Sequence, residues 1–436
     1  MKSTRPWTIR KSRLLREEMI THTLSCGLKA VLIPRRGFRQ KVFLLTTRYG
    51  SIDIQFRIDG DRDVTKTPAG VAHYLEHQLF KKRDRNILVD FGREGASSNA
   101  FTSACSTAFY VSCTEGTEKN LATLLDVVFS PFFSDENVTK ERTIIEQELR
   151  MYQDLPDHRC FANLLDALYH AHPARLEVGG TVESIQSIDR NMLEACHRTF
   201  YTPENMLLVA SGDLDAAKLF VFLEKRLGDL GVRGGLPAVR RDLPEEPPSA
   251  RAPRAGIAMS VSRPCIAIGF KDSARVRKGA EIVALELATN TILDAAFGKG
   301  SLSYDRLYRK GLIDDSFSAS FAREESFGHT VIGGETDDPD RLAEAIADVL
   351  RGLRRKGFNR RDIERLRRRR LGRYVRAFDS PEEIVFFSAD SLLKGVDPFD
   401  FPALIKGVKR GALFDRLESH FIDGNFSTSL ITPAGA

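Results

Sequence analysis

The sequence predicts an α+β fold made of two related domains in tandem. Residues 232–256 are rich in proline, glycine and charge and have almost no large apolar side chains, which is typical of a linker. This segment divides the 436-residue chain into halves of similar size. In each half, strand-like segments come first, helical segments follow and a strand closes the half. We therefore expect one domain over residues 1–231 and a second over residues 257–436, joined by the linker 232–256.

The first half opens with two strand-like segments, residues 29–34 and 41–49, which are rich in Val, Leu, Phe and Thr. A helix is predicted over residues 68–80, because Thr67 can cap it and Pro68 suits the first helical position. The other predicted elements are strands at 97–103 and 107–113, a long helical region at 118–153 and a closing strand at 205–212.

The second half repeats this order with little sequence identity. Its closing segment begins at Asn425, as the first one begins at Asn205, and it occupies the same place in its half. The predicted elements are strands within 257–270, a helix at 278–296, strands at 316–321 and 329–333, helices at 341–354 and 359–377, and a closing strand at 425–432.

Composition excludes some classes of protein. A net charge of +6 on 436 residues requires no anionic partner. No apolar run approaches the roughly 20 residues that span a bilayer, so no membrane partner is expected. Residues 1–17 lack the apolar core and cleavage site of a secretory signal, although their arginines loosely resemble an organelle transit peptide. The six cysteines form no CxxC pair, which favours a reducing, cytoplasmic location.

The chemistry is concentrated in the segment His73-Tyr-Leu-Glu-His77. On a helix, His73, Glu76 and His77 share one face, because residues three and four apart are neighbours. Two imidazoles at this spacing can reach one metal ion, and Glu76 lies beside them as a carboxylate that can accept a proton from water. HxxEH is the inverzincin order of a zinc-peptidase motif. The alternative is a pair of surface histidines on an amphipathic helix.

A catalytic zinc ion needs a third protein ligand on a separate element. Glu141 and Glu148 are the candidates, because they are seven residues apart and project from nearly the same side of a predicted helix. Glu146 points away from both. Without the upstream motif, the default interpretation of these acids is a solvated helix face with i, i+4 pairs.

Together these segments closely resemble the pitrilysin/insulinase family of zinc peptidases. The resembling blocks follow the family's order and spacing and cover nearly the whole first half: residues 70–80, 95–102, 141–156, 180–188 and 201–208. The resemblance implies two α/β-sandwich domains that enclose a chamber. It also implies an endopeptidase that cleaves unfolded or small peptides.

The resemblance further implies a role for each site residue. His73, His77 and Glu148 match the ligands of one Zn²⁺ per chain, and Glu76 matches the general base. Glu141 matches an acidic residue that does not bind the metal itself but supports one of the metal ligands. The run Asn99, Ala100, Phe101 and Thr102 matches the edge strand on which the family binds peptides by β-augmentation.

The second half departs from the family pattern. Many members carry an Arg and a Tyr there that help to bind substrate and stabilise the oxyanion. Here Leu302 stands where the Arg is expected, and no Tyr follows Ile313; Tyr304 and Arg306 are nearby alternatives. The second half has no HxxEH, so we expect it to be inactive.

Two functions remain open from the sequence. The first is an active zinc endopeptidase, alone or as a homodimer. The second is a silent or weak member that serves in a heterodimeric processing peptidase with a zinc-less homologue. The arginine-rich segment 351–376 has no aromatic residue within its arginine clusters and is diluted by Asp362 and Glu364. It is interpreted as a solvated face, so no nucleic-acid partner is expected.

Overall fold

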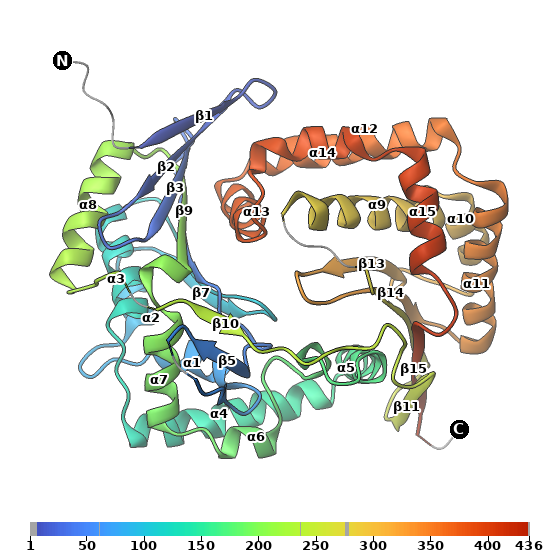
Figure 1. The fold of residues 1–436 in the computed structure, drawn as a ribbon, viewed down its shortest axis with the longest axis horizontal. Coiled ribbons are helices and arrows are strands. Elements are labelled where there is room, and N and C mark those ends of the chain that lie inside the picture. Colours follow the sequence, from blue (N-terminus) through green and yellow to red (C-terminus); the bar gives the residue numbers. More distant parts are fainter. Residues whose placement is uncertain (1–6, 61, 236, 275–278, 435–436) are drawn as a thin grey trace.

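Two α+β halves lie side by side in the computed structural model, which describes residues 7–60, 62–235, 237–274 and 279–434 (Figure 1). Each half is built around one mixed sheet that carries helices, which confirms the predicted fold class. The first sheet has the strand order β1-β2-β3-β9-β4-β8-β7. Its strands are β1 (Thr8–Ser12), β2 (Glu17–Thr23), β3 (Lys29–Pro34), β4 (Lys41–Thr47), β7 (Ser97–Thr102), β8 (Thr107–Cys113) and β9 (Met206–Gly212).

The second sheet has the order β11-β15-β12-β14-β13. Its strands are β11 (Arg254–Met259), β12 (Cys265–Lys271), β13 (Ser318–Arg323), β14 (Gly328–Glu335) and β15 (Phe426–Pro433). A small third sheet joins β5 (Gln55–Ile58) to β6 (Thr65–Lys66) and β10 (Val239–Arg241). The segment 232–256, predicted as a linker, therefore contains β10 and the start of β11.

Five strands of the first sheet, β3-β9-β4-β8-β7, repeat the topology of the second sheet, and β1 and β2 extend the first sheet further. β9 lies between β3, to which it is parallel, and β4, to which it is antiparallel. β15 lies in the same way between β11 and β12. The residue before each closing strand makes the same bond: the Asn205 amide donates to the carbonyl of Phe200 at 2.8 Å, and the Asn425 amide donates to the carbonyl of His420 at 2.7 Å. This repeated strand order and asparagine bond support the predicted duplication.

The halves exchange helices across their boundary. α5 (Pro156–Leu168) comes from the first half but packs on β12 and β15, whereas α13 (Pro381–Leu393) comes from the second half and packs on β4 and β9. The other helices are α1 (Val71–Leu79), α2 (Ile87–Arg93), α3 (Thr117–Phe129), α4 (Asp135–Gln153), α6 (Val182–Gln186), α7 (Arg190–Phe200), α8 (Ala216–Asp229), α9 (Ala280–Phe297), α10 (Leu302–Arg309), α11 (Pro339–Lys356), α12 (Arg360–Ala377), α14 (Phe401–Gly407) and α15 (Arg410–His420). Among the described residues, no helix is long and apolar enough to cross a membrane.

A continuous apolar core joins the halves. It includes Val31, Val42 and Val209 from the first sheet, together with Ile384 and Val385 of α13, and all five are almost fully buried. Because this apolar surface would be exposed if the halves separated, the hydrophobic effect holds them in one arrangement.

Two predicted helix boundaries are wrong. The helix predicted from Pro68 begins at Val71, and its cap is Gly70 with φ +94°, not Thr67. A side chain at Gly70 would lie 2.4 Å from the carbonyl oxygen of Gly179, so only glycine fits this close approach. The long helical region at 118–153 is two helices, because the chain breaks around Pro131.

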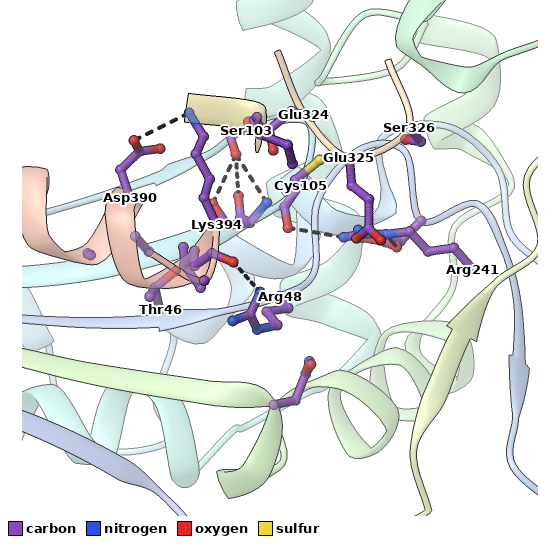
Figure 2. Close-up of a pocket in the computed structure, with 18 of the residues that line it drawn as sticks. Thr46, Arg48, Ser103, Cys105, Arg241, Glu324, Glu325, Ser326, Asp390 and Lys394 are labelled. Carbon is purple, nitrogen blue, oxygen red and sulfur yellow. Dashed lines mark hydrogen bonds and ion pairs between the residues drawn. The ribbon is translucent and has the colours of Figure 1, made fainter. Parts of the chain in front are cut away.

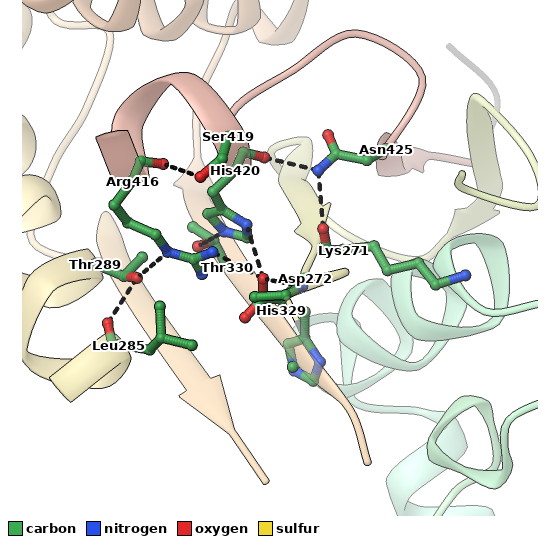
Figure 3. A network of polar contacts seen from close by, with 12 residues as sticks. Lys271, Asp272, Leu285, Thr289, His329, Thr330, Arg416, Ser419, His420 and Asn425 are labelled. Atoms are coloured by element: carbon green, nitrogen blue, oxygen red, sulfur yellow. Dashed lines mark hydrogen bonds and ion pairs between the residues drawn. The ribbon is translucent and has the colours of Figure 1, made fainter. Parts of the chain in front are cut away.

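A buried polar network anchors α15 to the second sheet (Figure 3). Asp272 follows β12 and pairs with Arg416 of α15 at 2.8 Å, and Arg416 also donates to Thr289 of α9 at 2.8 Å. Burial opposes ionisation of Asp272, but the hydrogen bond and charge of Arg416 outweigh it and lower the pKa of this carboxyl group. His420 of α15 contacts Thr330 of β14 through its Nε2 atom at 2.8 Å. The network is structural, since its ion pair and hydrogen bonds join α15 to α9 and to the second sheet.

Candidate metal centre

The two motif histidines lie on the open face of α1. The opposite face buries Val71, Tyr74 and Leu75 in the first-half core, so the helix is fixed in rotation. The Nε2 atoms of His73 and His77 approach to 3.3 Å. Spacing of four residues thus brings both rings to one point, as the sequence predicts.

The third candidate ligand, Glu148, lies on α4. Glu148 Oε2 lies 3.4 Å from His77 Nε2, and Glu148 Oε1 lies 3.8 Å from His73 Nε2. Tyr74 supports this approach by donating a hydrogen bond from its hydroxyl group to the carbonyl of Val138 in α4. In the part of the chain that the structure describes, His73, His77 and Glu148 are the one group of acids, histidines or cysteines that could hold a metal ion.

These three groups fit zinc. Ligands at zinc distances of about 2.1 Å in a tetrahedron lie about 3.4 Å apart, close to the spacing of the ring nitrogens and the carboxylate. Two imidazole lone pairs and a carboxylate that face one point repel each other unless a cation or proton lies between them. Burial and His77 lower the pKa of His73 to about 4, which keeps that ring neutral and able to bind metal.

Glu141 supports His77 from behind. Its Oε1 atom accepts a hydrogen bond from His77 Nδ1 at 2.9 Å, and its Oε2 atom pairs with Lys81 at 2.8 Å. Burial opposes charge on His77, but the bonds to Glu141 and Glu148 raise the pKa of that imidazole to about 9, so the site attracts positive charge. Glu141 therefore orients the Nε2 atom of His77 toward the metal position.

Glu76 lies beside this group without joining it. Its Oε2 atom accepts a hydrogen bond from the Thr102 hydroxyl at 2.7 Å, and its side chain is buried. Burial raises the pKa of Glu76, and the bond from Thr102 opposes this shift. A carboxylate with a raised pKa that is held in one orientation is suited to accept and return a proton.

The predicted substrate-binding residues lie along β7. This strand is at the edge of the first sheet, so one side of its backbone has no strand partner among the described residues. Asn99, Ala100, Phe101 and Thr102 line a cavity of about 740 Å³ that also contains the three candidate metal ligands. The edge strand, the carboxylate Glu76 and the candidate metal site thus share one space.

Tyr152 and His158 also line this cavity and were not identified from the sequence. Tyr152 lies one helical turn after Glu148 on α4, and its ring stacks on His158 of α5 at 4.9 Å. Burial raises the pKa of Tyr152, so its hydroxyl group stays protonated and can donate a hydrogen bond. The spacing of four residues between Glu148 and Tyr152 could have indicated that Tyr152 lies at the site. A tyrosine on a helix more often packs in the core than takes part in catalysis, so the sequence alone did not single it out.

The second half does not supply the donors suggested by its sequence. Tyr304 is buried in the second-half core, and Arg306 is exposed on α10. Neither residue lines the cavity around His73 and His77, so this structure does not place them to replace the family's Arg/Tyr pair within one chain.

A larger cavity of about 1090 Å³ lies between the halves (Figure 2). Its lining includes Arg48, Arg241, Glu324 and Lys394. Two of these cations already have acidic partners in this chain. Arg241 pairs with a buried aspartate, and Lys394 pairs with Glu286 at 2.8 Å. Within the described residues, this cavity contains no group of metal ligands. The candidate metal ligands His73, His77 and Glu148 line the smaller cavity instead.

Comparisons with known proteins point to one family of peptidases. Residues 57–182 match the family model "Insulinase (Peptidase family M16)", and residues 187–370 match "Peptidase M16 inactive domain". The protein named "Uncharacterized zinc protease YmfH" from Bacillus subtilis is 38% identical over 372 residues, which cover 85% of this chain and 86% of that protein.

Solved structures extend the similarity to the whole chain. A putative M16-like peptidase from Alicyclobacillus acidocaldarius superposes with a TM-score of 0.92 at 34% identity and covers 100% of both chains. Pitrilysin superposes with a TM-score of 0.74 at 19% identity and covers 99% of this chain but 47% of its own, a likeness of fold alone.

Proposed function

The chain belongs to the insulinase family, peptidase family M16, and we propose that it is a zinc-dependent endopeptidase that hydrolyses extended peptides. One observation carries the proposal. The Nε2 atoms of His73 and His77 and the carboxylate of Glu148 converge at tetrahedral zinc spacing, while Glu76 is held apart by Thr102 of an edge strand.

The side chains divide the work. His73, His77 and Glu148 would hold one Zn²⁺ per chain, and a zinc ion held there supplies acidity to a water molecule and polarises a peptide carbonyl. Glu76 accepts the proton of the attacking water at its carboxylate and returns it to the leaving amine. Thr102 keeps one Glu76 oxygen occupied, so the other oxygen is free for this transfer.

The free edge of β7 explains why the proposed substrates are extended peptides. A peptide can pair with the free edge at Asn99–Thr102 only if its backbone is extended and unpaired. A folded protein does not present such a segment, so unfolded or small peptides are the expected substrates.

The experiment compares the purified chain with Glu76→Gln, using a quenched fluorescent peptide and metal analysis. We expect about one zinc per chain in both proteins, cleavage by the parent that chelation abolishes and zinc restores, and cleavage by Glu76→Gln that is lower by several orders of magnitude. Loss of zinc from Glu76→Gln would make Glu76 a ligand. Full activity of that variant would place the base elsewhere.

Tyr152 brings one hydrogen-bond donor to the cavity, but the donors of the family's Arg/Tyr pair remain unassigned. Because Tyr304 and Arg306 do not line the cavity, we propose that a partner chain provides donors, either in a homodimer or in a heterodimer with a zinc-less homologue. Removing one such donor typically costs about a hundred- to a thousandfold in rate, so a lone chain would be weak. Strong zinc-dependent cleavage by a chain that sedimentation shows to be monomeric would refute the partner requirement.

A cytoplasmic location is a further part of the proposal. All six cysteines are free, and five of them are buried. Unpaired thiols are typical of a reducing compartment.

A further inference from the structure

The positive charge of this protein is concentrated in one helix. α12 carries nine arginines and two acids, a formal charge of +7, whereas the whole chain carries +6. Subtracting +7 from +6 leaves −1 for all the other residues together. Like charges along one helix repel each other, so such a cluster lowers stability unless a partner of opposite charge offsets it.

The arginines of α12 form an outward row. Ile363, Leu366 and Tyr374 are buried against the second half, so the opposite side of the helix faces solvent. That side carries the exposed residues Arg361, Arg365, Arg368 and Arg376, which follow the i, i+3, i+4 spacing of one face over about 22 Å.

Few acids neutralise this row. Asp362 pairs with Arg365 at 3.6 Å, and Glu364 pairs with Arg368 at 3.4 Å, both on the exposed surface. Such exposed pairs contribute little and are weakened by salt. In the described part of the chain, neither Arg361 nor Arg376 forms an ion pair, which leaves strong positive potential at both ends of the row.

A basic hairpin adjoins the same helix. β1 and β2 are joined by a tip that contains the exposed residues Arg13, Leu14 and Arg16, and Leu14 is 52% exposed. The hairpin is joined to α12 through one short turn, residues Pro398–Asp400, which strand β1 and α12 both contact. Arg10 of β1 pairs with Asp400 in that turn, and the Tyr374 hydroxyl of α12 donates to the Pro398 carbonyl at 3.1 Å.

Hairpin and helix share one edge of the molecule, at the top of the view in Figure 1. α1 and α4, which carry the candidate metal ligands, lie at the opposite, lower edge. A large partner on the basic edge would therefore leave the peptide cavity open.

We propose that this edge docks on an anionic lipid surface, with the α12 arginines against the headgroups and Leu14 inserted between them. The exposed leucine distinguishes lipid from nucleic acid, because a bilayer offers an apolar phase to a side chain flanked by cations and a phosphate backbone does not. The exposed arginine row also lacks the aromatic side chains on which bases stack. The docking is peripheral and does not depend on the proposed peptidase activity.

Vesicle co-sedimentation of the full-length chain tests the proposal. We expect binding to phosphatidylcholine vesicles that contain about one third phosphatidylglycerol, release at high salt, and no binding to phosphatidylcholine alone. Each arginine near the surface contributes about fivefold, so the quadruple variant R361Q/R365Q/R368Q/R376Q should bind at least about a hundredfold more weakly. Leu14→Ser should bind about tenfold more weakly because it loses the inserted side chain.

A matched control separates this surface from overall charge. R93Q/R190Q/R240Q/R309Q removes the same number of exposed arginines from other elements and should bind vesicles as the parent does. Thermal unfolding of each variant verifies that it is folded. The proposal is overturned if the parent does not bind anionic vesicles or binds both lipid compositions equally. It is also overturned if R93Q/R190Q/R240Q/R309Q loses as much binding as R361Q/R365Q/R368Q/R376Q. Binding to a mixed-sequence oligonucleotide but not to vesicles would also overturn it.

Discussion

Replacing Glu148 by glutamine should release the metal without unfolding the protein. The carboxylate lies 3.8 Å from His73 Nε2 and 3.4 Å from His77 Nε2, so its charge acts directly on a cation bound between the rings. A unit charge pair at about 4 Å near a protein surface is worth about 4 kcal/mol, which corresponds to about a thousandfold in zinc affinity. Because the dication carries twice that charge and would lie closer, a thousandfold is a lower bound.

The assay is competition for zinc between the purified chain and a fluorescent chelator, followed by metal analysis. Glu146→Gln is the matched control, because Glu146 is on the same helix, pairs with Arg150 at 2.7 Å and is not among the converging ligands. The metal-free forms of both variants should unfold near the parent's temperature, since the side chain of Glu148 is 24% exposed. Zinc affinity in Glu148→Gln equal to that of Glu146→Gln would refute the third ligand.

Three further predictions concern the support of the site and the second half. Glu141→Gln should weaken zinc binding about 10- to 100-fold in the same competition assay, because His77 loses its orienting carboxylate; unchanged affinity would exclude this role. Asp272→Asn should lower the free energy of unfolding in urea by about 3 kcal/mol, because Arg416 is left buried without its partner; a loss below 1 kcal/mol would contradict the buried network. Burial lowers the pKa of His329 to about 4 and that of His420 to about 3 in the folded protein, whereas an unfolded histidine has a pKa of about 6.5. At pH values between the folded and the unfolded pKa, the unfolded state therefore binds more protons than the folded state. The metal-free chain should therefore lose up to about 1.4 kcal/mol per pH unit for each histidine as the pH falls from about 6.5 to 4, and urea unfolding curves that coincide at pH 7 and pH 5 would contradict this.

Local patterns predicted the elements that carry the site. The strands at 29–34 and 107–113 match β3 and β8 residue for residue, because short apolar runs bounded by turns specify strands. The convergence of His73, His77 and Glu148 followed from helical spacing within two separate segments. Pro131 offered a signal for the break between α3 and α4 that the prediction did not use.

What could not be predicted depends on contacts between distant segments. The start of α1 is set by Gly70 against Gly179, and nothing in residues 67–71 reveals that contact. The exchange of α5 and α13 between the halves is likewise set by apolar faces that fit the other half's sheet. Both helices look like ordinary amphipathic segments along the chain, so their partners appear only in the folded structure.

X-ray diffraction at the zinc absorption edge, from crystals of the zinc-loaded chain, tests the central claim most directly. We predict one anomalous peak per chain, at about 2.0–2.2 Å from His73 Nε2, His77 Nε2 and a Glu148 oxygen, with Glu76 near the ion but not bonded to it. No peak at this site in zinc-soaked crystals, or a peak coordinated by Glu76, would contradict the proposed metal centre.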